Sequence, residues 1–310
     1  MDRDVLNRKL LFVTGKGGTG KTTVAGALAL AAARRGKRVL LLEVDMTRPS
    51  IADIFSASVS GRPRPIRPGI DAANVLFIDA LRAYLTETVS VEMVVNALLR
   101  NKVVRYFLES TPYARELSFL NYFYHYYRDA QNARRYDLIV VDLPSSGHAI
   151  PILRVASDVL EMFHIGPLHK RAVELQAFLG DQRRVGMILV TLAEELPVNE
   201  TIETWIKAKK ELPIRIEGVV VNRVADFPDD PALMDAIQTL AIPEDVQLTP
   251  RLIEVIASVK EALGDYVRNR QFISRLREEM ALPLFLTHEI LTDDERSPAF
   301  ELVGQLESQL

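Results

Sequence analysis

The chain has 310 residues, a formal net charge of -3 and no cysteine. This length is enough for one large α/β domain with room for a helical insertion. The absence of cysteine excludes disulfides, thiolate zinc sites and iron–sulfur clusters. The slightly negative charge, with no basic stripe of interleaved aromatic residues, gives no reason to expect a nucleic-acid partner.

Two other features bear on location in the cell. The sequence has no apolar run of about 18 residues, so we expect no membrane-spanning helix. The first residues, MDRDVLNRK, lack the apolar region of a signal peptide. We therefore expect a cytoplasmic protein.

The strongest pattern lies between Leu10 and Asp45. It reads as a buried strand, a glycine-rich loop, an alanine- and leucine-rich helix, and a second apolar strand over Val39–Val44. The loop fits the phosphate-binding motif G-x-x-x-x-G-K-[ST] in the strand-to-helix context that this motif requires. A turn that merely joins a strand to a helix is the alternative. The residues expected around the phosphates are Gly15, Gly17, Gly18, Thr19, Gly20, Lys21, Thr22 and Thr23.

These residue types suit a nucleoside triphosphate for physical reasons. Glycines let backbone N–H groups turn toward an anion, and the helix N-terminus adds partial positive charge. Lys21 is placed to reach the β- and γ-phosphates, and Thr22 can offer its hydroxyl to Mg²⁺. We therefore expect a nucleoside triphosphate and Mg²⁺ as the cofactors.

A second lysine, Lys16, lies inside the loop, where the general motif does not require one. The run KGGTGKT resembles the deviant Walker A loop of a branch that includes Min and Par ATPases, nitrogenase-type iron proteins, arsenical pump ATPases and tail-anchored-protein targeting ATPases. In that branch the extra lysine crosses a dimer interface to the partner's nucleotide. The resemblance implies a catalytic Lys16 and a dimeric protein; a solvated surface lysine is the alternative.

The second strand ends on Glu43-Val44-Asp45, followed by MTRPSIADIF. This ending resembles the D-x-D of the Min and Par proteins. The resemblance implies that Asp45 is the switch I residue, which positions the attacking water near Mg²⁺, and that Glu43 acts on Mg²⁺ through water. Pump and targeting ATPases usually read D-P-A-H here, and this chain differs. A helix or loop cap is the alternative for Asp45.

The run Tyr136–Asp142, YDLIVVD, predicts a buried strand that ends on an acid. This is the Walker B pattern, which delivers a carboxylate to the Mg²⁺ shell. The continuation to His148 resembles D-T-A-P-T-G-H, switch II of the arsenical pump and tail-anchored targeting ATPases. The resemblance implies that Asp142 holds Mg²⁺ through water, and that Gly147 and His148, in a loop, relay the nucleotide state.

The run Gly218–Arg223 predicts a strand that ends near Asn222. In the family that the chain resembles, an Asn at this place hydrogen-bonds adenine, and a side-chain amide can pair with a base edge. The resemblance therefore places Asn222 and Arg223 at the base, with a strand-end turn as the alternative. No guanine-reading T-K-x-D or N-K-x-D is present, which favours ATP.

Outside these motifs the pattern is mainly helical. Ser56–Ala73, rich in Gly, Pro and Arg, predicts a surface loop, and Asn74–Ala80 predicts a strand. Leu81–Arg128 has helical spacing and an aromatic cluster around His125. This cluster forms either a client-docking or dimer surface or a cover for the sheet. Pro151–Leu179 predicts two helices.

The C-terminal part predicts a long amphipathic helix over Pro250–Glu279, a strand over Leu282–Leu286, and a last helix that carries Phe300. A membrane-surface role for the last helix is a second interpretation. Its two glutamates and its lack of Lys and Arg argue against that role.

The resemblance to the arsenical pump and tail-anchored targeting ATPases spans nearly the whole chain. It implies an α/β fold: a mostly parallel twisted sheet with helices on both faces, as in P-loop NTPases, plus a helical subdomain. We expect a single domain over 1–310, with a helical insertion over roughly 81–130 and a second helical segment over roughly 151–180.

The expected function is that of a Mg²⁺-dependent ATPase, a nucleotide-driven dimeric switch that handles a protein client or a membrane partner. One alternative is the energising subunit of an oxyanion efflux pump, although the lack of cysteine excludes a soft thiolate site for arsenite. Another is a regulatory partner in a heterodimer with a paralogue. The sequence leaves open whether the dimer is a homodimer or a heterodimer.

Overall fold

The structure, a computed structural model, describes residues 4–44, 49–89, 92–102, 106, 110–111, 113–133, 135–240, 249–290 and 298–310. The strands are β1 Leu10–Gly15, β2 Val39–Val44, β3 Arg64–Arg67, β4 Ile70–Val75, β5 Leu138–Asp142, β6 Val185–Leu192, β7 Arg215–Val224 and β8 Leu284–His288. The helices are α1 Lys21–Arg34, α2 Ser50–Phe55, α3 Phe77–Val89, α4 Glu92–Arg100, α6 Ala114–Ala133, α7 Ser146–Met162, α8 Pro167–Leu179, α9 Glu195–Glu211, α10 Pro231–Thr239, α11 Pro250–Met280 and α12 Pro298–Glu307, after a short 3-10 helix η1 Val5–Asn7.

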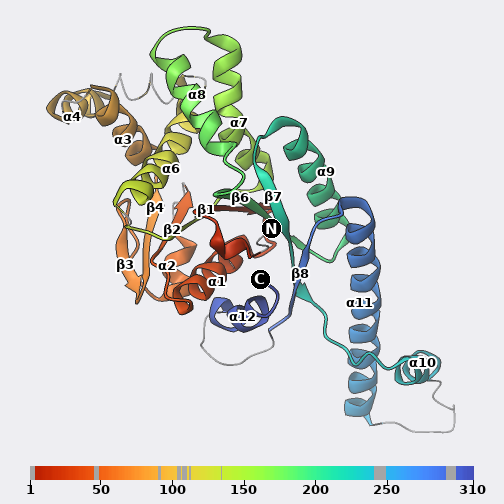
Figure 1. The fold of residues 1–310 in the computed structure, drawn as a ribbon. Coiled ribbons are helices and arrows are strands. Elements are labelled where there is room, and N and C mark those ends of the chain that lie inside the picture. The colour runs from red at the N-terminus through yellow and green to blue at the C-terminus, as the bar shows by residue number, and fades with distance from the viewer. Residues whose placement is uncertain are drawn as a thin grey trace.

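One eight-stranded sheet forms the centre of the molecule, with the strand order β3-β4-β2-β5-β1-β6-β7-β8 (Figure 1). Neighbouring strands are parallel except β3 and β4, which are antiparallel. This arrangement confirms the predicted α/β fold with a mostly parallel sheet. The division into one domain with two helical segments stays a prediction.

The inner strands β1, β2, β5 and β6 are buried almost throughout because helices cover both faces of the sheet. Leu10 and Phe12 of β1 point into a core under α3, α6, α7, α8 and α9, whereas Leu11 and Val13 point into a core with α1, α2 and α12. This alternation explains why the core strands have continuous apolar sequences rather than a polar–apolar alternation.

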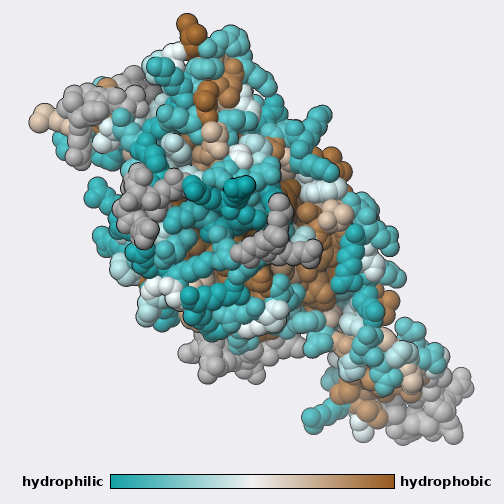
Figure 2. Space-filling model, viewed as in Figure 1, coloured by the Kyte–Doolittle hydropathy of each residue, from teal (hydrophilic) through white to brown (hydrophobic). Residues whose placement is uncertain are grey.

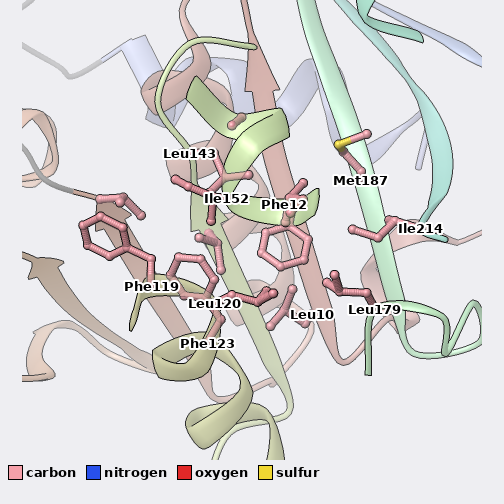
Figure 3. Close-up of a cluster of buried hydrophobic side chains, with 14 of the residues drawn as sticks. Leu10, Phe12, Phe119, Leu120, Phe123, Leu143, Ile152, Leu179, Met187 and Ile214 are labelled. Atoms are coloured by element: carbon pink, nitrogen blue, oxygen red, sulfur yellow. The ribbon is translucent and has the colours of Figure 1, made fainter. Parts of the chain in front are cut away.

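The aromatic cluster of α6 covers the sheet. The rings of Phe12 and Phe123 meet edge to face, with their centroids 5.8 Å apart (Figure 3). Tyr122, Phe123 and Tyr127 are all buried. The interpretation of these residues as a cover for the sheet is therefore confirmed.

Two expectations for residues 56–80 are wrong. Arg64–Arg67 and Ile70–Val75 form an edge hairpin, in place of the loop expected up to Ala73. Strand β4 is fixed by its pairing with β2, from Val39 opposite Ile70 to Val44 opposite Val75. The strand expected over Asn74–Ala80 is therefore displaced, and Phe77 begins helix α3 with its apolar residues at helical spacing.

Helix α12 belongs to the core. It packs against α1, and its Leu302, Val303 and Leu306 are buried. The ring of Phe300 also meets that of Phe55 from α2, with centroids 5.9 Å apart. The interpretation of this helix as a membrane-surface element is therefore wrong, because its apolar side is already covered.

The long helix α11 extends beyond the sheet (Figure 1). Its second half packs on the molecule through Ile273 and Leu276, whereas Ile253 and Val255 near its start are about half exposed. Figure 2 shows the resulting hydrophobic patch where α10 meets the start of α11. None of the helices in the described ranges combines the length and the apolar character that crossing a membrane requires.

Candidate nucleotide-binding site

The glycine-rich loop connects the carboxyl end of β1 to α1, and β1 lies between β5 and β6. Ligands of open α/β sheets bind at this end of the strands. Gly15 packs closely on β6, because a Cβ there would lie 2.0 Å from the carbonyl oxygen of Val190. Gly18 and Gly20 have φ angles of 86° and 87°, which favour glycine. Close packing at Gly15 and the positive φ angles of Gly18 and Gly20 explain why the loop needs these glycines.

Lys21 folds back along the loop. Its Nζ donates a hydrogen bond to the carbonyl oxygen of Lys16 at 3.1 Å, and the hydroxyl of Thr19 donates to the same carbonyl at 2.9 Å. Burial lowers the pKa of Lys21, and the nearby charge of Asp142 partly opposes this shift. The lysine is therefore held against the loop backbone, where the motif needs a cation for the phosphates.

Lys16 points toward α9. Its Nζ lies 2.5 Å from Oε1 of Glu200, and both side chains are partly exposed. The structure therefore gives this lysine a carboxylate partner within its own chain. The predicted contact with the nucleotide of a partner subunit stays a prediction.

Thr22 and Asp142 connect the first turn of α1 to the end of β5. The Thr22 hydroxyl donates a hydrogen bond to Oδ2 of Asp142 at 2.6 Å. Burial, with a contribution from the negative charge of Glu43, raises the pKa of Asp142 to about 7, although the Thr22 hydrogen bond and Lys21 oppose the shift. The structure thus brings together two residues that the sequence assigned to Mg²⁺.

The donor set at this point fits Mg²⁺. Oδ1 of Asp142 is buried and has no hydrogen-bond partner within the described residues. A buried carboxylate oxygen of this kind normally has a partner, such as an ordered water or an ion. Mg²⁺ typically takes one or two protein oxygens and completes its shell with phosphate oxygens and waters. Thr22 and Asp142 can supply such a pair.

Glu43 caps a helix. Its carboxylate is buried and accepts the backbone N–H groups of Ser50 at 2.8 Å and Ile51 at 3.3 Å, at the start of α2. Burial raises the pKa of Glu43, although these hydrogen bonds lower it. Glu43 also lies opposite Asp142 in the pairing of β2 with β5. Its predicted action on Mg²⁺ stays a prediction, and Asp45 lies outside the described residues.

Gly147 and His148 lie in the first turn of α7, where both are exposed. The expectation that they lie in a loop is wrong, because α7 begins at Ser146, directly after the strand and the short segment that contains Pro144. The Thr14 hydroxyl donates to the Pro144 carbonyl at 3.0 Å and ties this segment to β1. The predicted relay role of the two residues stays a prediction.

Asn222 lies beneath the loop. The residue is buried, and its Nδ2 donates to the carbonyl oxygen of Thr19 at 2.9 Å. Its Oδ1 accepts a hydrogen bond from the hydroxyl of Thr287 in β8, also at 2.9 Å. Both ends of the amide therefore contact protein groups, and the predicted contact with adenine stays a prediction.

Arg223 lies in a different environment. It is exposed, has a φ angle of 54°, and lines a cavity of about 470 Å³ at the carboxyl ends of β6 and β7. Asn269 of α11 fixes this region, because its amide accepts the N–H of Ala225 at 2.7 Å and donates to the carbonyl of Ala193 at 3.0 Å. Arg223 and Asn222 thus face different surroundings although they are neighbours.

The sequence did not point to the roles of Glu200, Thr287 or Asn269. Glu200 lies in a run that resembles the family, but nothing in that run indicates a partner 184 positions away. Thr287 is likewise 65 positions from Asn222. Contacts at such separations follow from the sheet order, which the sequence alone does not determine.

Comparison with known proteins agrees with this site. Residues 8–167, just over half of the chain, match the model of a family described as Anion-transporting ATPase. The ATPase BagA of Mycobacterium tuberculosis is 33% identical over 227 residues, which are 69% of this chain and 65% of that protein. The Arsenical pump-driving ATPase of Acidiphilium multivorum is 28% identical over 73% of this chain and 41% of its own length.

A third relative, the Putative arsenical pump-driving ATPase of Halobacterium salinarum, is 28% identical over 72% of this chain and 36% of its own length. The chain thus spans less than two thirds of each of these three relatives. The family model covers the loop, Lys21, Thr22 and Asp142, which are the residues that the structure brings together. The chain belongs to the anion-transporting ATPase family.

Proposed function

We propose that the protein is a Mg²⁺-dependent ATPase that works as a dimeric switch and acts on a protein client or a membrane partner. The observation that carries this proposal is the 2.6 Å hydrogen bond from Thr22 to Asp142. It joins the phosphate-binding loop to the carboxylate of the neighbouring strand, the arrangement that P-loop ATPases use for ATP and Mg²⁺.

In this proposal each residue of the site has its own role in binding or hydrolysis. The loop N–H groups and Lys21 bind the phosphates, and Lys21 neutralises charge that develops on the γ-phosphate. Thr22 and Asp142 hold Mg²⁺, which, when bound, shields phosphate charge. Asp45 orients the attacking water. Lys16, which the structure pairs with Glu200 of α9, adds its charge to the nucleotide of the partner subunit.

A membrane oxyanion pump is the second candidate, because two relatives are named arsenical pump-driving ATPases. In that case the protein would energise an integral transporter. The absence of cysteine in this chain argues against arsenite bound by thiolates. An oxyanion bound through oxygen or nitrogen groups remains compatible with the sequence.

The enzymatic part of the proposal is tested with purified wild type, Lys21→Ala, Asp45→Asn and the control Lys207→Ala, whose exposed lysine lies on α9 away from the loop. Phosphate release is measured with and without Mg²⁺. We expect Lys21→Ala and Asp45→Asn to lower kcat by about 10²–10³, because each removes a positioned charge. A native rate in Lys21→Ala would contradict the mechanism.

The switch is tested with Asp45→Asn, which should hold ATP without hydrolysing it. Light scattering with ATP and with ADP gives the mass of the particle, and the proposal requires a dimer in ATP. Proteins captured with the ATP-bound variant in the native host are then identified by mass spectrometry. Single-span membrane proteins support a targeting role, and an integral transporter supports the pump. A related ATPase indicates a heterodimer, and capture of the protein alone removes the client from the proposal.

A further inference from the structure

Two buried side chains, one from β7 and one from β8, connect the sheet to the phosphate-binding loop through hydrogen bonds. Thr287 of β8 donates its hydroxyl to Oδ1 of Asn222 in β7, and Nδ2 of Asn222 donates to the carbonyl oxygen of Thr19. Both distances are 2.9 Å, and both side chains are buried. Three segments that are far apart in sequence thus meet in one line of hydrogen bonds.

The direction of these hydrogen bonds orients the amide. Thr287 acts as a donor toward Asn222, so the acceptor Oδ1 must face Thr287. Nδ2 then faces the Thr19 carbonyl and donates one N–H to it. Without the hydroxyl of Thr287 the amide would lose this orientation, and a buried polar atom would lack its partner. Thr287 therefore acts on the loop through Asn222.

The hydrogen bond from Asn222 fixes the orientation of the peptide group between Thr19 and Gly20. A peptide bond is planar and trans, so its C=O and N–H groups point in opposite directions. Because Asn222 holds the Thr19 carbonyl on the side of the strands, the N–H of Gly20 must point away from them. In the phosphate-binding motif, that is the direction from which backbone N–H groups meet the anion.

The packing around Gly20 leaves little freedom. Gly20 has a φ of 87°, and a Cβ on it would lie 2.3 Å from Nδ2 of Asn222. The Thr19 side chain is fully buried, and its hydroxyl donates to the Lys16 carbonyl. Asn222 therefore packs closely against the peptide that it holds, and α1 starts one residue later at Lys21.

We propose that Asn222 and Thr287 are positioning residues that fix the Thr19–Gly20 peptide for binding the triphosphate. The inference rests on the proposed function, because it presumes that the loop binds ATP. Both side chains are buried, and hydrogen bonds join Thr287 to Asn222 and Asn222 to the Thr19 carbonyl.

The decisive variants are at Thr287, which lies behind Asn222. Thr287→Val keeps the shape of the side chain and removes the hydroxyl, and Thr287→Ser restores a hydroxyl. Thr204→Val is the matched control, since Thr204 is a buried threonine of α9 outside this line of hydrogen bonds. Affinities for ATP, GTP and ADP are measured by equilibrium binding, together with kcat and KM for ATP.

We expect Thr287→Val to lower the affinities for ATP and GTP by the same factor of about ten. A loss of this size is typical of a buried hydrogen bond that orients a binding group. The ratio of ATP to GTP affinity should stay at the wild-type value. Thr287→Ser should recover most of the loss, and Thr204→Val should change neither affinity. Asn222→Ala should likewise weaken the binding of both nucleotides.

The opposite results overturn the inference. If Asn222→Ala abolishes the preference for ATP over GTP while Thr287→Val leaves ATP affinity unchanged, Asn222 reads the base. If Thr287→Val and Thr287→Ser lose affinity equally, the hydroxyl does not position the loop. A wild-type protein that binds no nucleotide would instead refute the proposed function itself. Thermal unfolding of each variant without nucleotide separates misfolding from a loss of binding. If Asn222→Ala does not fold, the comparison of Thr287→Val with Thr287→Ser still tests the inference.

Discussion

Lys16 Nζ and Glu200 Oε1 lie 2.5 Å apart, so the additional lysine of the loop is paired within its own chain. The two side chains are 29% and 44% exposed, respectively. Ion pairs with this exposure contribute at most about 1 kcal/mol, because water screens them. Such a pair can exchange for a stronger partner, and the proposed switch requires Lys16 to leave Glu200 for the phosphates of a second subunit.

Glu200→Gln should therefore strengthen the ATP-dependent dimer. Removal of a competing carboxylate worth at most about 1 kcal/mol predicts a two- to fivefold lower dissociation constant. Sedimentation of the Asp45→Asn background in ATP measures this constant, and low salt should enlarge the effect. Glu203→Gln, an exposed carboxylate on the same helix, is the control. A weaker dimer would mean that Glu200 supports the interface instead of competing with it.

A second ionic cluster predicts a pH dependence of stability far from the loop. Glu87 of α3 interacts with Nδ1 of His125 at 2.6 Å, and with Arg128 and Arg171. Burial alone would raise the pKa of Glu87, but the His125 hydrogen bond and the charges of Arg171, His125 and Arg128 outweigh it, so the pKa is lowered. The ionised carboxylate therefore stabilises the folded protein.

The sign follows from the lowered pKa. The stabilisation is present above the ordinary value of 4.5 and is lost as the pH falls through the lower folded value. We expect Glu87→Gln to lower the free energy of unfolding by about 1–3 kcal/mol at pH 7. The difference from wild type should shrink below pH 4.5, as measured by urea unfolding. A difference that is constant from pH 7 to pH 3.5 would exclude an ionic origin.

The sequence predicted those parts of the site that lie within one local pattern. Lys21 and Thr22 follow from the loop motif, and Asp142 follows from an apolar strand that ends on an acid. Their meeting follows from the topology, since β5 pairs directly with β1. Glu200 and Thr287 could not be predicted, because their partners lie 184 and 65 positions away and no local pattern indicates the contact.

The errors in the fold have a similar origin. Strand β3 has exposed arginines and a proline, so its sequence resembles a loop, and only pairing with β4 makes it a strand. The end of β4 is set by its register with β2, which no residue of β4 indicates. The helix-capping role of Glu43 could not be assigned from the sequence, because the N–H groups that it accepts are seven and eight positions away.

The position of α12 predicts that its apolar residues serve stability. Leu306 is fully buried, in the core that α12 shares with α1. Leu306→Ala should lower the free energy of unfolding by about 2–5 kcal/mol, through lost burial and a cavity. Leu196→Ala, at a residue 66% exposed, should change it by less than about 0.5 kcal/mol.

Chemical denaturation of both variants tests this assignment. Flotation with anionic vesicles tests the alternative, in which α12 is a membrane-surface helix. If α12 were a membrane-surface helix, Leu306→Ala would reduce vesicle binding and leave stability unchanged. The packing against α1 predicts the reverse outcome, a loss of stability with no effect on vesicle binding.

The contact between Gly20 and Asn222 predicts a coupled pair. A Cβ at Gly20 would lie 2.3 Å from Nδ2 of Asn222, at a φ of 87° that disfavours other residues. Gly20→Ala should therefore destabilise the nucleotide-free protein by at least about 2 kcal/mol, from the backbone strain and the overlap together. Gly304→Ala on α12, where a Cβ would meet none of the described atoms within 4 Å, should be neutral or slightly stabilising.

A double-mutant cycle separates the two causes. In the background of Asn222→Ala the overlap is gone, so Gly20→Ala should cost less, and the remaining cost reports the φ angle alone. We expect a coupling of at least about 1 kcal/mol in urea unfolding, since residues in direct contact couple by about 0.5–3 kcal/mol. Additive effects would mean that Asn222 moves aside freely, which would also weaken its assignment as the residue that holds the Thr19–Gly20 peptide.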